Sequence, residues 1–181
     1  MDDLFKKLKE ALDEATEDLK KNDEPLLMHN VNERSITHKL AEYLQKHLPE
    51  YNVDCEYNRN TDQGSKKIKR LSLKLEEIIE ESGVGIKSKI INNSEYYETS
   101  VYPDIIVHKR GENHNNLLII EVKKSSANKD AYNYDCEKLK AYTDNSEGNS
   151  LKYFYGVLIE IETGNNCTVK CDKWFKNGEE M

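Results

Sequence analysis

The sequence predicts an α/β fold in which a mixed β-sheet carries helices on its faces. Two patterns predict it: apolar residues recur at helical spacing in some segments, and in others they form short runs or alternate with polar residues. These two kinds of segment follow one another along the chain. At 181 residues the chain has the length of one domain, and we expect a helical extension at residues 1–25 followed by a single domain at residues 26–181.

Four helices are expected from stripes of apolar residues that repeat every three or four positions. Asn22 to Pro25 end the first stripe, which is expected to pack or to dimerise. The second helix is expected to start with a capping box in which Asn30 is the cap and Glu33 is the third residue after it, and Pro49 ends this helix. The four predicted segments are residues 2–21, 30–48, 66–82 and about 130–142.

Strands are expected where branched and aromatic residues cluster. The run from Val101 to His108 and the run from Leu117 to Lys124 are joined by a polar loop, so they are expected to form an antiparallel hairpin. Residues 92–98 are expected to form a loop or the edge of a strand. The predicted strands are residues 51–58, 101–108, 117–124, 153–161 and 167–171.

The net charge of the chain limits the kinds of partner that it can bind. A formal charge of −7 argues against a protein that coats nucleic acid through bulk electrostatic attraction. It leaves room for an enzyme that holds a few phosphates, because lysine and arginine also occur in local groups. Each group alone is more often a solvated surface than a binding site. The groups are Lys66, Lys67, Lys69 and Arg70; Lys87 and Lys89; and Lys109 and Arg110.

The N-terminus and the cysteines favour a cytoplasmic protein. Charged residues begin at Asp2, and no segment approaches the ~20 apolar residues of a membrane span, so neither a secretory signal nor a membrane partner is expected. Three residues separate Cys167 from Cys171, and such a pair is half of a zinc site if a second Cys/His pair lies nearby. No such second pair is evident in the sequence, and ordinary reduced thiols are the favoured interpretation of the cysteines.

Charged residues interrupt the two most apolar predicted strands. Residues two apart on a strand share a face, so Glu121 and Lys123 are expected on one face and Val122 on the other. In the expected hairpin, Asp104 comes beside Glu121. Since the run from Leu117 to Val122 is otherwise apolar, Glu121 is expected to be buried, where an unpaired carboxylate loses several kcal/mol of hydration. Two such carboxylates favour a bound cation, and Mg²⁺ prefers oxygen ligands of this kind.

These residues resemble the signature of the PD-(D/E)xK nucleases, a superfamily with the restriction-endonuclease-like fold. The resemblance lies in Pro103-Asp104, sixteen intervening residues and then Glu121-Val122-Lys123, and it extends over roughly residues 30–161. It implies a core ordered α, β, β, β, α, β, with the acidic pair on adjacent strands. It also implies a further glutamate from the first core helix, and Glu33 occupies the corresponding place.

The resemblance implies hydrolysis of phosphodiester bonds with Mg²⁺, for which Mn²⁺ can substitute. Asp104 and Glu121 would hold the metal ion, and Glu33 would contribute directly or through a water molecule. Lys123 would position or activate the attacking water, so these four residues are the predicted catalytic residues. A capping box explains Glu33 equally well, and a solvated ion pair is the alternative interpretation of Glu121 and Lys123 taken alone.

The predicted helix at about 130–142 adds candidate contacts to a phosphate. Asp135, Lys138, Leu139 and Tyr142 resemble an Asp-x-x-Lys-Leu pattern of some families with this fold. A solvated ion pair between residues three apart explains Asp135 without a function, and we favour that interpretation for this residue. The candidate contacts to nucleic acid are Lys124, Lys138 and Lys140.

The expected function is therefore that of a metal-dependent nuclease, acting on DNA rather than RNA by analogy with the family. One alternative is a catalytically silent member of the same fold that binds nucleic acid or a protein. Another is an acidic interaction protein that assembles through its N-terminal helix. A homodimer or a target-reading protein partner is also expected, because a single active centre cuts only one strand of a duplex.

Overall fold

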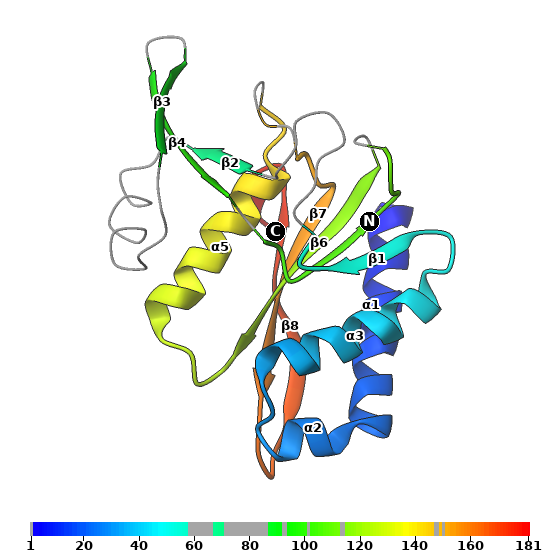
Figure 1. The fold of residues 1–181 in the computed structure, drawn as a ribbon. Coiled ribbons are helices and arrows are strands. Elements are labelled where there is room, and N and C mark those ends of the chain that lie inside the picture. Colours follow the sequence, from blue (N-terminus) through cyan, green and yellow to red (C-terminus); the bar gives the residue numbers. More distant parts are fainter. Residues whose placement is uncertain are drawn as a thin grey trace.

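The computed structural model describes residues 2–57, 67–70, 87–91, 94–100, 102–112, 115–146, 149 and 151–181, with the backbone alone between residues 67 and 100. These residues form a mixed α/β fold (Figure 1). The helices are α1 (Asp3–Asn22), α2 (Glu24–Met28), α3 (Glu33–His47) and α5 (Lys129–Thr143). The strands are β1 (Asn52–Cys55), β2 (Lys67–Arg70), β3 (Lys87–Ile91), β4 (Ser94–Ser100), β5 (Ile105–His108), β6 (Asn116–Lys124), β7 (Tyr155–Glu162), β8 (Thr168–Lys176) and β9 (Glu179–Glu180).

The larger sheet contains six strands in the order β1-β5-β6-β7-β8-β9. Neighbouring strands are antiparallel except for β6 and β7, which are parallel and are connected through α5. The predicted hairpin is confirmed as β5 and β6, although β5 begins only at Ile105. Pro103 has no backbone N–H, and the carboxylate of Asp104 accepts a hydrogen bond from the Val122 N–H at 2.8 Å. At this point a side chain, rather than the backbone of β5, binds the backbone of β6.

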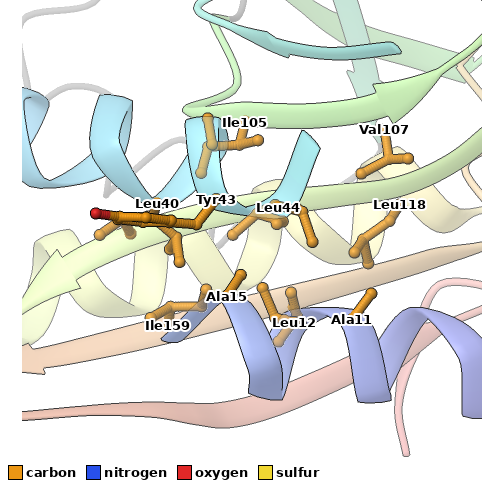
Figure 2. Packing of buried hydrophobic residues seen from close by; sticks show 14 of the residues in the cluster. Ala11, Leu12, Ala15, Leu40, Tyr43, Leu44, Ile105, Val107, Leu118 and Ile159 are labelled. Carbon is orange, nitrogen blue, oxygen red and sulfur yellow. The ribbon is translucent and has the colours of Figure 1, made fainter. Parts of the chain in front are cut away.

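Helices α1 and α3 cover one face of the larger sheet (Figure 1). Their apolar side chains pack against β5, β6 and β7 in one continuous hydrophobic cluster, so the stripe predicted for the first helix is buried in the core. Removal of this apolar surface from water stabilises the packing of α1 and α3 on the sheet by about 25 cal/mol per Å². Figure 2 shows part of the cluster: Ala11, Leu12, Ala15, Leu40, Tyr43, Leu44, Ile105, Val107, Leu118 and Ile159.

Helix α5 covers the opposite face, over a smaller cluster that includes Ile106 and Ile119. The helix approaches β7 closely at Gly156. A Cβ atom at Gly156 would lie 3.2 Å from Leu139 Cδ2 and 3.2 Å from Thr143 Cγ2. A larger residue would therefore push against α5, and the absence of a side chain at Gly156 sets how closely this helix lies over the sheet.

The start of α3 differs from the predicted capping box. The N-cap is Asn32 rather than Asn30, and its side chain accepts a hydrogen bond from the Arg34 N–H at 2.8 Å. Asn30 instead has a φ of 51°, in the left-handed region that asparagine tolerates. Glu33 is the first residue of the helix. The short helix α2 is not among the predicted helices, because Pro25 is expected to end a helix. In the structure Pro25 lies in the first turn of α2, where its missing N–H is harmless.

Pairing between distant segments overrides the helix predicted at residues 66–82. Residues Lys67–Arg70 form β2, which pairs with β4 in a three-stranded sheet ordered β2-β4-β3. The prediction is therefore wrong at its start, and residues 71–82 lie outside the described residues. Residues 92–98, expected as a loop or a strand edge, overlap the first part of β4.

The C-terminal segment extends the larger sheet further than predicted. The strand expected at residues 167–171 continues as β8 to Lys176 and then pairs with β9. The remaining predicted helices and strands agree with the structure within a few residues at each end. Among the described helices, none is both long enough and apolar enough to cross a membrane.

Candidate active site

The predicted catalytic residues meet on the face of the sheet that α5 covers. In the register of β5 and β6, the next position beyond the Ile105–Ile120 pair places Asp104 opposite Glu121. Glu121 and Lys123 both contact residues of α5, whereas the residue between them is buried in the core on the α1 and α3 side. The alternation predicted for this strand is therefore confirmed.

A chain of ion pairs joins β6 to α5. Lys138 Nζ lies 2.8 Å from Glu121 Oε2 and 2.8 Å from Asp135 Oδ1. The other oxygen of Asp135, Oδ2, lies 2.9 Å from Lys123 Nζ. Two acids thus alternate with two lysines, and Asp135 holds both ammonium groups.

Burial strongly affects the acids of this cluster. The side chains of Glu121 and Asp135 are 2% and 3% exposed, and that of Lys138 is 12% exposed. Burial raises the pKa of Glu121 well above its ordinary value; the ammonium of Lys138 opposes this shift, and the negative charge of Asp104 adds to it. Burial also raises the pKa of Asp104, against the effect of the Val122 N–H. Both acids would lose their protons more readily if a cation lay beside them.

The two lysines of the cluster are charged at neutral pH. Burial alone would lower the pKa of Lys123, but the carboxylates of Asp135, Glu33 and Asp104 together outweigh burial, and the net shift is upward. Burial likewise acts to lower the pKa of Lys138, yet the negative charge of Glu121 and its other neighbours raises it well above its ordinary value. Both ammonium groups are therefore hydrogen-bond donors rather than proton acceptors.

Glu33 lies at the open edge of this cluster. Its Oε1 atom is 3.8 Å from Lys123 Nζ, and its Oε2 atom accepts a hydrogen bond from the Lys124 N–H at 3.1 Å. The side chain of Glu33 is 33% exposed. Because Asn32 caps the helix, the capping-box explanation of Glu33 does not hold, and its observed contacts are with β6.

The donor set fits a divalent cation that keeps most of its water ligands. The buried Oε1 atom of Glu121 has no hydrogen-bond partner among the described residues, which is rare for a buried carboxylate. The cluster contains four carboxyl groups and two ammonium groups, so the acids outnumber the cations that could pair with them. In the described part of the chain, no three Cys, His, Asp or Glu side chains form a preassembled metal site. Mg²⁺ needs only one or two carboxylates beside its waters, and Asp104 and Glu121 are the residues of this cluster that could supply them.

The three lysines predicted to contact nucleic acid all have partners within the protein. Lys124 Nζ lies 2.9 Å from Asn30 Oδ1, so this lysine ties β6 to the loop before α3. Lys140 Nζ lies 2.7 Å from Glu137 Oε1 on the same helix. Lys138 belongs to the buried chain of ion pairs described above.

Asp135 is the site residue whose role the sequence interpretation missed. The expected ion pair with Lys138 exists at 2.8 Å, but it is buried, so the prediction of a solvated pair is wrong. One signal pointed to burial: Asp135, Lys138, Leu139 and Tyr142 have the spacing of one helix face, and the last two are fully buried. Charged residues on a buried face need partners on the facing element, and here β6 supplies them.

A second charged cluster connects β1 to the end of β5. Asp54 Oδ2 lies 2.8 Å from His108 Nε2 and accepts a hydrogen bond from Arg110 Nε at 2.9 Å. The hydrogen bonds from Arg110 hold the pKa of Asp54 below its ordinary value. Arg110, predicted as part of a basic surface group, is therefore engaged in joining these strands.

The four cysteines are free thiols. Burial raises the pKa of Cys55 to about 11 and that of Cys171 to about 12, so both thiols stay protonated at neutral pH. Cys171 packs against the core on the α1 and α3 side, as does Cys167. Within the described ranges, no third ligand joins these two cysteines in a metal-binding group.

Comparison of the chain with protein-family models, with curated proteins and with solved structures gives no match in any of the three. The case for a function therefore depends on the geometry, burial and charge of the site itself.

Proposed function

We propose that the protein is a Mg²⁺-dependent nuclease that hydrolyses phosphodiester bonds in DNA. The observation that carries the proposal is the burial of Glu121 with one carboxylate oxygen that accepts no hydrogen bond within the described part of the chain. This residue is buried opposite Asp104 and on the same face as Lys123, and one of its carboxylate oxygens has no hydrogen-bond partner among the described residues. A buried acceptor without a partner destabilises a fold, and a cation would satisfy it.

The order of the elements supports membership of the restriction-endonuclease-like fold. Apart from β2, β3 and β4, the chain runs α3, β1, β5, β6, α5, β7, which is the order α, β, β, β, α, β that the PD-(D/E)xK resemblance implies. The strand order β1-β5-β6-β7 makes β5 and β6 neighbours. Asp104 directly precedes β5, and Glu121 and Lys123 lie on the neighbouring strand β6, which supports the resemblance.

Each residue has a defined part in the proposed reaction. Asp104 and Glu121 would hold a divalent cation, and the chemistry that such an ion supplies is polarisation of the phosphoryl group, a lower pKa of bound water and stabilisation of the leaving oxygen. Lys123, held by Asp135 at 2.9 Å, would donate a hydrogen bond that orients the attacking water or a phosphate oxygen. Its raised pKa makes it a donor and not a general base. Glu33, at the open edge, would accept a hydrogen bond from a water of the site.

The smaller sheet supports nucleic acid as the substrate. Residues opposite one another in an antiparallel ladder share a face, as do residues two apart on a strand. The register of β2, β4 and β3 therefore assigns the positions of four lysines, one glutamate and one tyrosine to one face, and β2 lies beside α5 (Figure 1). Positive charge combined with an aromatic ring suits a phosphate backbone and its bases. The residues of this face include Lys67, Lys69, Lys87, Lys89, Tyr96 and Glu98.

The test is a cleavage assay with supercoiled DNA, linear duplex DNA, single-stranded DNA and RNA, each with Mg²⁺, Mn²⁺ or EDTA. We expect cleavage of DNA with either metal and none with EDTA. Glu121→Gln removes a charged metal ligand with little change of shape, and it should lower the rate at least about 100-fold. Glu137→Gln is the matched control, because Glu137 lies on α5 but pairs with Lys140 outside the site.

The outcomes separate the proposal from its alternatives. Undiminished cleavage by a folded Glu121→Gln protein would contradict the proposed site. DNA binding without cleavage under every metal condition would favour a catalytically silent, nucleic-acid-binding member of the same fold. Failure to bind or cut any of the nucleic acids would favour an acidic interaction protein.

A further inference from the structure

Lys138 already supplies a positive charge to the proposed metal site. Its Nζ atom lies 2.8 Å from Glu121 Oε2, and the lysine side chain is only 12% exposed. The ammonium group therefore neutralises the same carboxylate that the proposed function assigns to the metal ion. The other oxygen of this carboxylate, Oε1, is buried without a hydrogen-bond partner among the described residues.

We propose that Lys138 is a built-in competitor of the divalent cation: it binds Glu121 in the metal-free protein and gives up that contact when the metal ion binds. This inference rests on the proposed function, since it takes Glu121 as a metal ligand. The ammonium group of Lys138 lies 2.8 Å from Glu121 Oε2, so it repels a cation that binds the same carboxylate. Burial weakens the screening of that repulsion by water. Lys138 on Oε2 therefore weakens the binding of a cation to the same carboxylate, and the bound cation weakens the contact of Lys138.

Asp135 makes the exchange feasible. It lies on α5 three residues before Lys138, and its Oδ1 atom is also 2.8 Å from Lys138 Nζ. Lys138 consequently keeps a buried partner after it leaves Glu121, and no unpaired ammonium group is created. Asp135 holds Lys123 through its second oxygen at 2.9 Å, so the exchange leaves the proposed water-positioning lysine in place.

Competition of this kind weakens binding of the metal ion to the protein alone. A phosphodiester that enters the site brings negative charge and further oxygen ligands, both of which favour the cation over the lysine. The site would thus load its metal ion together with the substrate. Control of metal loading is the regulatory role that the geometry assigns to Lys138.

The experiment is calorimetric titration of Mn²⁺ into the purified protein without nucleic acid, at a pH above neutrality. Lys138→Met should bind Mn²⁺ at least about tenfold more tightly than the native protein, because the competing charge is gone. Lys140→Met is the matched control: it removes an ammonium group of the same helix that pairs with Glu137 at 2.7 Å, and it should bind like the native protein. Equal or weaker binding by a folded Lys138→Met protein would overturn the proposal.

A second measurement uses the native protein and does not depend on the stability of Lys138→Met. In protein labelled with ¹⁵N at lysine Nζ, a buried ammonium group exchanges slowly with water, and the Lys138 signal is identified by its absence in Lys138→Arg. Addition of Mg²⁺ should shift this signal, and an unchanged signal at saturating Mg²⁺ would overturn the proposal.

The two hypotheses fail in different ways. If DNA is cut but Lys138→Met leaves Mn²⁺ affinity unchanged, the competitor role is wrong and the nuclease stands. If Lys138→Met tightens Mn²⁺ binding but no nucleic acid is cut, the competition is supported and the nuclease is wrong.

Discussion

The two faces of the larger sheet are built on different principles. On the face covered by α1 and α3, the buried side chains of the described residues are hydrophobic apart from Thr16 and Thr37. On the face covered by α5, Glu121 and Asp135 are buried, and their lysine partners are half-buried. The first face is stabilised by burial of apolar surface. The second face buries less apolar surface, because it holds charged groups that are partly removed from water.

Under the proposed function, this difference assigns the ligand to the face covered by α5. Buried ion pairs are often no more stabilising than well-packed hydrophobic residues of similar volume, because dehydration of the charges offsets their attraction. Stability alone therefore does not explain why four charged side chains lie between β6 and α5. A requirement for charge at that place does explain it, and hydrolysis of a phosphodiester with a metal ion is such a requirement.

Breaking one ion pair on the α5 face should have the largest effect on stability. Lys138→Met leaves Glu121 and Asp135 buried with one ammonium group fewer, and loss of one partner of a buried pair costs about 3–5 kcal/mol. The double variant Lys138→Met/Glu121→Gln should recover a large part of this loss, because the stranded carboxylate is also removed. Urea denaturation in EDTA measures both variants. Equal stability of Lys138→Met and the native protein would mean that this face is not the charged, dehydrated one.

A truncation on the other face should affect stability but not the site. Leu44 is fully buried between α3 and the sheet, and Leu44→Ala should lower the free energy of unfolding by about 2–5 kcal/mol. Its Mn²⁺ affinity, measured well below the unfolding temperature, should stay within about a factor of two of the native value, since distant sites act independently. A change as large as that expected for Lys138→Met would show that the two faces are not separate.

The pH dependence of stability should differ between the native protein and Glu121→Gln by a smaller amount. Burial raises the pKa of Glu121 above its ordinary value of 4.5, so the folded protein keeps this proton at pH values where the unfolded chain has lost it. The contribution of Glu121 to the free energy of unfolding consequently falls as the pH rises above 4.5, until the pH passes the raised value.

The measurement is urea denaturation of both proteins in EDTA, from about pH 5 to about pH 8. Glutamine does not titrate, so Glu121→Gln should become more stable relative to the native protein as the pH rises. A constant difference between the two proteins over this range would contradict the raised pKa.

The hydrophobic face could be predicted from local sequence patterns far better than the charged face. The apolar stripe at residues 2–21 and the alternation around Glu121 and Lys123 report directly on neighbouring positions of one helix or one strand. The positions of both charged side chains on one face followed from that alternation. The hairpin that places Asp104 opposite Glu121 followed from the polar loop between two extended runs.

What could not be predicted depends on segments that are far apart in the chain. Strand β2 was mistaken for a helix because its partner β4 is distant in sequence. The contact between Lys138 and Glu121 depends on how closely α5 lies over β7, which Gly156 sets. No local pattern reports that distance, so the sequence does not reveal which residues of β6 pair with Asp135 and Lys138.

The most direct test of the central claim is the single-turnover rate of DNA cleavage in saturating Mg²⁺ by Lys123→Met and by Lys170→Met. Lys123 lies in the charged cluster under α5, whereas Lys170 is an exposed lysine that pairs with Glu160 at 3.1 Å. We expect Lys123→Met to cut at least about 100-fold more slowly than the native protein, and Lys170→Met to stay within about twofold of it. Equal rates for the two variants would contradict the assignment of catalysis to the α5 face.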